Sequence, residues 1–180
     1  MAGPRSSLLG TAAWLLATRP ELAATLRTEP DLIPVFVEEV LRLESPFRGH
    51  YRHVVADTTL GGVELPAGSH LYLLWGSANR DPAVFDRPGE ILLERRRGHL
   101  AFGRGIHFCV GAAPARMEAR AAIGMLLRRT RDSAPSTPRR AGRRAIWCAA
   151  FPVSISLWPD RRPIARPTPP RVSEFLWAEQ

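Results

Sequence analysis

The chain has 180 residues, of which 45% are hydrophobic, and this suffices for one domain with its own core. No apolar run reaches the roughly eighteen residues of a membrane-spanning helix, and the first residues lack the basic start and apolar block of a signal peptide, so we expect a cytoplasmic protein without membrane contact. The net charge of +8 comes from arginine alone, since the chain contains no lysine.

The positive charge is unevenly distributed along the chain. Residues 131–180 hold nine arginines against four acids, whereas the first 130 residues hold sixteen against thirteen. Together with many alanines and prolines, this pattern is typical of a GC-rich genome rather than of a phosphate-binding surface. A nucleic-acid-binding module is therefore the least favoured interpretation.

Three helices are predicted in the first 45 residues. Apolar residues recur at helical spacing over 6–19, and a second helix over 21–27 has Pro20 in its first turn. Asp31 is a candidate N-cap for a third helix that runs to about Leu43. These segments predict a helical first part of the domain.

The next segment has the character of strands. Four strands are predicted over 51–55, 58–60, 63–65 and 70–74. Gly61 and Gly62 indicate a turn between the second and third strands, and residues 66–68 favour a hairpin between the third and fourth. A loop-rich stretch follows over 79–100. We therefore expect a small antiparallel sheet between helical segments.

A last helix is predicted over 111–129, and the regular spacing of apolar residues ends soon after it. Its predicted apolar side is Ala113, Met117, Ala121 and Met125. No periodicity survives after residue 132, and prolines alternate with arginines there, so we expect a domain over 1–131 and a disordered tail over 132–180. The fold class is thus mainly α with a small antiparallel β-sheet.

Residues 101–111 form a glycine-rich loop that brings a cysteine to the start of the last helix. Glycine lets backbone approach a flat ligand closely, and amide hydrogens at a helix N-terminus favour a thiolate over a thiol. Phe102 supplies an apolar cover, and His107 precedes Cys109 by two residues, where it can meet an anionic group of the same ligand. The alternative is a buried structural cysteine beside glycines. The only other cysteine is Cys148, so no disulfide framework is expected.

This loop resembles the haem-binding loop of the cytochrome P450 family, F-x-x-G-x-[R/H]-x-C-x-G. Phe102, Gly105, His107, Cys109 and Gly111 fill every defined position of the pattern. The resemblance implies haem b (iron protoporphyrin IX) as cofactor, with the Cys109 thiolate as axial ligand of its iron.

The resemblance continues upstream of the loop. Glu39 and Arg42 form the family's E-x-x-R pair, which lies 70 residues before the cysteine. In the family this pair joins a later arginine in a structural triad; Arg95 is the best candidate, with Arg96 and Arg97 as alternatives. Arg52 corresponds to a family arginine that pairs with a haem propionate, although an exposed arginine on a strand would look the same.

Two segments depart from the family pattern. The first residues resemble the end of its oxygen-binding motif, but Arg5 replaces the acid and Ser6 the threonine of a proton-relaying pair, so Ser6 is the one candidate catalytic residue. More than half of a family domain would precede this point. After residue 131, a family strand is replaced by Ser133–Pro138, which a single-base frameshift would explain. Pro114 stands one position late for the family and is expected to destabilise its helix slightly.

The resemblance implies a partial cytochrome P450 fold, its C-terminal part, and the activity of a monooxygenase. That activity inserts one oxygen atom of O2 into a small organic substrate, with electrons from NAD(P)H through a ferredoxin and its reductase. Arg104, Arg116 and Arg120 are either a docking patch for an acidic ferredoxin or ordinary solvated arginines. The alternative function is that of a truncated, non-catalytic remnant that binds haem weakly or not at all.

Overall fold

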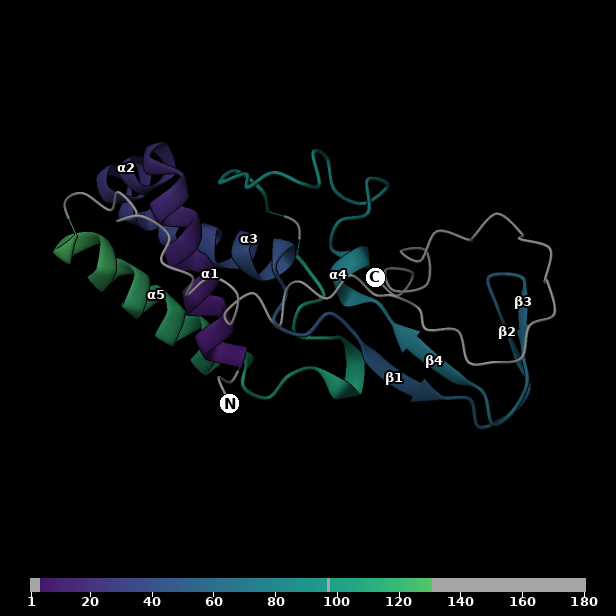
Figure 1. Cartoon of the computed structure of the whole chain (residues 1–180). Helices are drawn as coiled ribbons and strands as arrows, with labels where there is room; N and C mark the ends of the chain where they lie inside the picture. Colours follow the sequence, from purple (N-terminus) through teal and green to yellow (C-terminus); the bar gives the residue numbers. More distant parts are fainter. Residues whose placement is uncertain (1–3, 97, 131–180) are drawn as a thin grey trace, which may run out of the picture.

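The computed structural model describes residues 4–96 and 98–130, and Figure 1 shows how their elements are arranged. Helices gather at one end of the molecule, and the strands extend from the other. The helical end contains α1 (Pro4–Thr18), α2 (Pro20–Thr28), α3 (Ile33–Leu43) and α5 (Ala112–Arg129). The strands are β1 (His50–His53), β2 (Thr58–Leu60), β3 (Val63–Leu65) and β4 (His70–Leu73). The short helix α4 (Trp75–Ala78) and the turns η1 (Pro30–Leu32) and η2 (Gly105–His107) complete the order. The predicted fold class is confirmed.

The core lies between α1, α2, α3 and α5, and α3 is its most enclosed element. Phe36, Val37 and Val40 of α3 are fully buried against apolar side chains from α1 and α5. The predicted N-cap at Asp31 is wrong, because Asp31 lies inside η1 and α3 begins only at Ile33, without a side-chain cap. Pro30 and Pro34 open the two successive turns, since proline fits the first turn of a helix.

Helix α5 buries a different face from the predicted one. Its buried residues are Ala112, Ala119, Ile123, Gly124 and Leu127. The predicted apolar side is solvent-exposed, with Met117 at 66% and Met125 at 46% of full exposure. Pro114 is the third residue of α5, where the backbone N–H has no partner within the helix, so its expected destabilising effect does not apply.

The strands form two separate antiparallel pairs. β1 pairs with β4, with Arg52 opposite Leu71, and β2 pairs with β3, with Thr59 opposite Glu64. The turn at Gly61 and Gly62 is confirmed, since both have positive φ angles. The hairpin expected over residues 66–68 is wrong: that segment carries the chain from β3 to β4, which do not pair.

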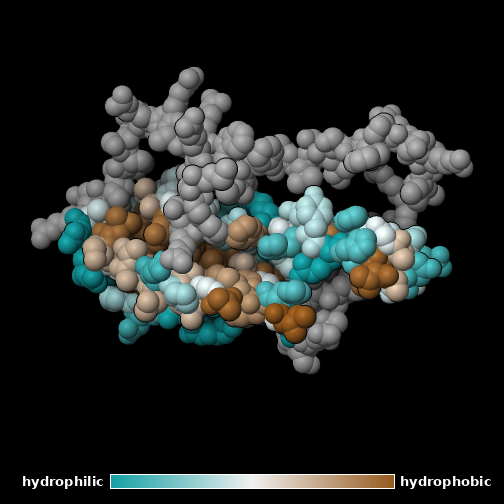
Figure 2. Space-filling view, turned by 90° about the horizontal axis from the view of Figure 1, so that it is seen from below, coloured by the Kyte–Doolittle hydropathy of each residue, from teal (hydrophilic) through white to brown (hydrophobic). Residues whose placement is uncertain are grey.

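The surface of the helical end carries both hydrophobic and hydrophilic residues. Figure 2 shows hydrophobic residues gathered over the helices on this face, while hydrophilic residues are more frequent toward the strands. Within residues 4–96 and 98–130, no helix is long and apolar enough to cross a membrane.

Candidate functional site

The loop before α5 folds back on itself so that its cysteine faces outward. The Cys109 N–H donates to the Phe102 carbonyl at 2.9 Å, which closes the loop. Gly103 and Gly105 have φ angles of 72° and 66°, a region that favours glycine. Cys109 is exposed, which contradicts the alternative of a buried structural cysteine. The thiol therefore projects from a closed loop, three residues before α5 begins.

Cys109 lines a pocket of about 590 Å³ between the helices and the β1–β4 pair. This volume lies in the range of small-molecule and cofactor sites. The lining residues come from α1, α3, the segment between α3 and β1, β1, α4, α5 and the cysteine loop; they are Leu8, Leu41, Pro46, Phe47, His50, Arg52, Trp75, Ala101, Phe102, Gly103, Arg104, His107, Cys109, Gly111 and Ala115. Segments far apart in sequence thus meet around one thiol.

Two of the predicted anion-binding side chains lie in this pocket. Arg52 on β1 and His107 in η2 both line it, and Arg52 Nη1 donates to the Tyr51 carbonyl at 2.9 Å. The remaining Arg52 N–H groups can pair with a ligand carboxylate. The structure thereby brings Arg52, His107, Phe102 and Gly111 together with Cys109; Gly105 lies in the same loop but does not line the pocket.

The pocket suits a flat apolar group with acidic substituents and its own metal. Its walls are mainly aliphatic and aromatic, with arginine and histidine side chains among them. Within the described residues, no three His, Cys, Asp or Glu side chains are placed to hold a metal ion together. A metal held at Cys109 would therefore bring most of its ligands with it, as the iron of a porphyrin does.

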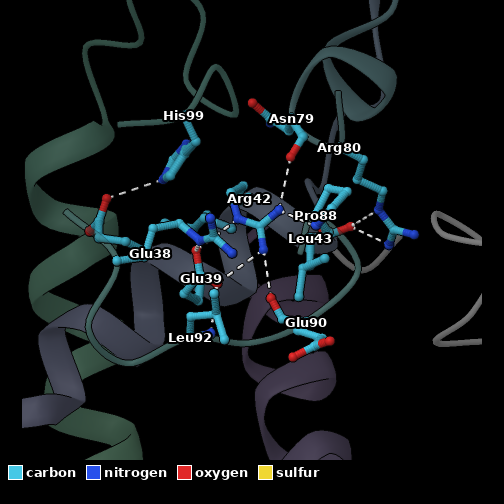
Figure 3. A network of polar contacts seen from close by, with 12 residues as sticks. Glu38, Glu39, Arg42, Leu43, Asn79, Arg80, Pro88, Glu90, Leu92 and His99 are labelled. Carbon is cyan, nitrogen blue, oxygen red and sulfur yellow. Dashed lines mark hydrogen bonds and ion pairs between the residues drawn. The ribbon is translucent and has the colours of Figure 1, made fainter. Parts of the chain in front are cut away.

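Glu39 and Arg42 of α3, which do not line the pocket, form a buried ion pair (Figure 3). Arg42 Nε lies 2.7 Å from Glu39 Oε1 and Arg42 Nη2 lies 3.0 Å from Glu39 Oε2, so the pair is bidentate. Arg95 adds a second cation, with its Nε 3.0 Å from Glu39 Oε1. Among the three arginines considered for the triad, Arg95 is thus the one in contact; Arg96 is exposed, and Arg97 lies outside the described residues.

Glu39 and Arg42 also fix the backbone between α4 and the cysteine loop. The other three Arg42 N–H groups donate to the carbonyls of Asn79, Pro88 and Glu90. Glu39 Oε2 accepts the Leu92 N–H at 3.0 Å. Burial raises the pKa of Glu39, but the hydrogen bonds from Arg42 and Leu92 outweigh it and lower the pKa. The carboxylate is therefore held charged.

Asn79 is a further positioning group that the sequence did not reveal. Asn79 is fully buried; its Oδ1 accepts the Leu100 N–H at 2.7 Å and its Nδ2 donates to Ser45 Oγ at 2.9 Å. The bond to Asn79 fixes the position of Leu100, the residue just before the cysteine loop. A polar residue in a loop-rich stretch carries no signal that it will be buried, so only the tertiary structure identifies it.

The remaining predicted site residues divide into three cases. Ser6 belongs to α1 by its backbone, but its side chain lies outside the described set. Arg116 is engaged internally by Glu38, at 2.8 Å, so it is not a free member of the predicted docking patch. Arg104 is exposed, and Arg120 Nη2 lies 4.0 Å from Glu38 Oε1.

Comparison with known proteins gives a consistent result. The family model "Cytochrome P450" matches residues 15–138, which extends past the predicted domain boundary at 131. Residues 131–180, with the predicted tail and frameshift, lie outside the described residues. Cytochrome P450 144 of Mycobacterium tuberculosis is 60% identical over 127 residues, which are 69% of this chain and 29% of that protein. 6-Deoxyerythronolide B hydroxylase of Saccharopolyspora erythraea is 40% identical over 68% of this chain and 31% of that protein.

A solved structure agrees with both relatives. CYP109E1 from Bacillus megaterium, in complex with testosterone, superposes with a TM-score of 0.68 at 38% identity, over 70% of this chain and 35% of that one. The chain therefore spans about a third of the length of the relatives it matches. With its family model, its relatives and its fold in agreement, the chain belongs to the cytochrome P450 family, for which haem is the implied cofactor.

Proposed function

We propose that this chain carries the cysteine-ligand side of a haem-thiolate monooxygenase. The observation that supports it best is the pocket, in which the exposed Cys109 thiol meets Arg52, His107 and Phe102 between apolar walls. Such a donor set matches haem b: a thiolate for the iron, cationic and N–H groups for two propionates, and a dry surface for the macrocycle.

Each residue has a distinct role in this proposal. Cys109 supplies the thiolate, and the loop closed by its N–H bond to the Phe102 carbonyl presents it. Arg52 and His107 orient the ligand through its carboxylates. Glu39, Arg42 and Arg95 hold the backbone that leads into the loop. Bound haem supplies the redox chemistry, in which a thiolate ligand favours O–O bond cleavage.

The activity and partners follow the family as proposals. We propose the insertion of one oxygen atom of O2 into a small organic substrate, with electrons from NAD(P)H through a ferredoxin and its reductase. Arg104 and Arg120 remain the candidates for electrostatic docking, since Arg116 is engaged by Glu38. Ser6 is proposed as the hydroxyl that takes part in proton relay, and Arg5 beside it cannot deliver protons as a carboxylate does.

Haem titration of the purified chain tests the proposal. Reduced protein under carbon monoxide should show the red-shifted Soret band of a thiolate ligand. Cys109→Ala should lose that band, whereas the matched control Cys148→Ala should keep it. Absence of haem uptake by the wild type would favour the non-catalytic remnant. A red-shifted band that survives in Cys109→Ala would contradict Cys109 as the ligand.

A further inference from the structure

Glu38, the neighbour of Glu39 on α3, binds Arg116 and His99, two side chains that converge on the cysteine loop; a third side chain, Arg120, has its Nη2 4.0 Å from Glu38 Oε1. Arg116 of α5 donates two hydrogen bonds to the Glu38 carboxylate, from Nε to Oε1 and from Nη2 to Oε2, both at 2.8 Å. His99, just before the loop, places its Nε2 3.1 Å from Glu38 Oε2, as Figure 3 shows. Glu38 therefore ties α3 to α5 and to the start of the loop at once.

The hydrogen bonds of His99 fix its orientation. Its side chain is only 3% exposed, and its Nδ1 accepts the Ala101 N–H at 3.1 Å. An accepting Nδ1 carries no proton, so the proton of the neutral ring lies on Nε2 and is donated to Glu38. This ring orientation thereby links the Glu38 carboxylate to the backbone of Ala101.

Arg116 contacts Phe102, the residue that follows Ala101 in the cysteine loop. Its guanidinium carbon lies 4.5 Å from the centre of the Phe102 ring, which is the geometry of a cation–π contact. The Phe102 carbonyl in turn accepts the Cys109 N–H. Two routes therefore lead from Glu38 to the cysteine loop, one through His99 and Ala101 and one through Arg116 and Phe102.

We propose that Glu38 is a positioning residue for Cys109, and that its charge balance with Arg116 sets the electric field on the Phe102 side of the pocket. The geometric part rests on the contacts alone, and the electrostatic part rests on the proposed haem site. The role differs from that of Glu39, which anchors the Leu92 backbone earlier in the chain.

The two members of the pair should affect a bound haem in opposite directions. Reduction of the iron adds negative charge near Cys109. Glu38→Gln leaves the Arg116 cation uncompensated, which favours the reduced state and raises the reduction potential. Arg116→Met removes the bidentate partner of the Glu38 anion and leaves only a neutral His99 and the Arg120 cation, whose Nη2 is 4.0 Å away, so the local charge becomes more negative and the potential falls. A purely structural contact would shift both variants in the same direction, because both break the same pair.

Amide hydrogen exchange of the full-length chain without haem tests the geometric part. Exchange at Ala101 and Cys109 should be about tenfold faster or more in Glu38→Gln and Arg116→Met, because each loses charge-assisted hydrogen bonds. Arg129→Met, at an exposed position of the same helix, is the matched control and should exchange as the wild type. Unchanged exchange in both variants would overturn the inference, whether or not the chain binds haem.

Redox potentiometry of the haem-loaded chain tests the electrostatic part. Opposite shifts in Glu38→Gln and Arg116→Met are expected, with Arg129→Met close to the wild type. Arg116→Lys keeps the charge without the planar fork, so it should retain a potential near the wild type while its loop amides exchange faster. Potentials that move in the same direction in the two variants would overturn the inference. Failure of the wild type to take up haem would instead contradict the proposed function, and the exchange rates would then decide the inference alone.

Discussion

Arg42 is a buried cation whose bonding capacity is completely used. Its side chain is 1% exposed and that of Glu39 is 3% exposed. All five of its N–H groups have acceptors, two on Glu39 and three on backbone carbonyls. The guanidinium also lies 5.1 Å from the centre of the Phe85 ring. A buried charge is tolerated only under such full pairing, so its removal is costly.

Arg42→Met should therefore destabilise the chain strongly. The substitution leaves the Glu39 carboxylate short of its main partner and three carbonyls unpaired, so we expect a loss of about 3–5 kcal/mol in the free energy of unfolding. Urea denaturation followed by circular dichroism measures it. Arg87→Met is the control, because the ion pairs of Arg87 are exposed and worth about 0–1 kcal/mol. Equal losses in the two variants would refute the assigned role of Arg42.

The acid dependence of stability should report on Glu38. Burial raises the pKa of this group, but hydrogen bonds from His99 and Arg116 outweigh it, and the pKa falls from 4.5 to about 2. A folded-state pKa below the unfolded value means that the stabilisation is complete above about pH 4.5 and is lost as the pH falls toward about 2.

The gap in stability between wild type and Glu38→Gln should therefore narrow on acidification. It is largest near neutral pH and shrinks between about pH 4.5 and about pH 2, because glutamine has no proton to gain. Urea midpoints of both proteins, measured across this range, give the gap directly. A gap that stays constant with pH would show that the Glu38 carboxylate does not contribute in its charged form.

At the scale of elements, the sequence predicted which segments form helices and turns better than it predicted which segments pack or pair with one another. Apolar spacing located the four long helices because each buries one face, and Gly61 and Gly62 located one turn because only glycine adopts both φ angles easily. In α5 two apolar rows compete, and the row of Ile123 and Leu127 is buried because α1 and α3 lie on that side. Periodicity cannot decide between such rows without the neighbours.

The site shows the same division between local and tertiary information. The spacing of the cysteine loop identified Cys109, His107 and Phe102, because a loop motif is local in sequence. The pairing of β1 with β4 and the burial of Asn79 were not predictable, since both depend on segments that are distant in the sequence. Sequence reasoning thus identified Cys109 as the candidate ligand-binding group and missed much of the framework that positions it.

Glycine positions in α1 and in the β2–β3 turn offer a matched test of these elements. Gly10 lies inside α1 and Gly62 in the turn with a φ of 76°, and a Cβ at either would meet nothing within 4 Å. Because both positions have room for a methyl group, they differ in backbone conformation alone. Gly10→Ala should therefore stabilise the chain by roughly 0.5–1 kcal/mol, and Gly62→Ala should destabilise it.

Thermal or urea unfolding of both glycine variants decides the matter. The expected result is a rise in the midpoint for Gly10→Ala and a fall for Gly62→Ala. Shifts of the same sign would mean that packing, rather than backbone conformation, determines the effect at one of the two positions.

At the scale of the whole molecule, the pocket lies where the helical end meets the strands. Leu8 of α1, Arg52 of β1 and Ala115 of α5 all line it. A ligand in this position bridges the helices and β1, and the strands extend away from the helices in Figure 1. Binding and folding should therefore be linked in this chain.

Haem should raise the thermal unfolding midpoint of the whole chain. A ligand that binds only the folded state stabilises it by about 2.7 kcal/mol at a hundredfold excess over its dissociation constant. Protoporphyrin IX without iron is the matched ligand, because it keeps the macrocycle and both carboxylates but offers Cys109 no metal. Haem should raise the unfolding midpoint of the wild type more than the metal-free ring does. In Cys109→Ala the two ligands should raise the midpoint equally. Arg52→Met should weaken both effects, since it removes a carboxylate partner that both ligands share. An equal gain from the two ligands in the wild type would mean that the pocket binds the ring without using its thiol.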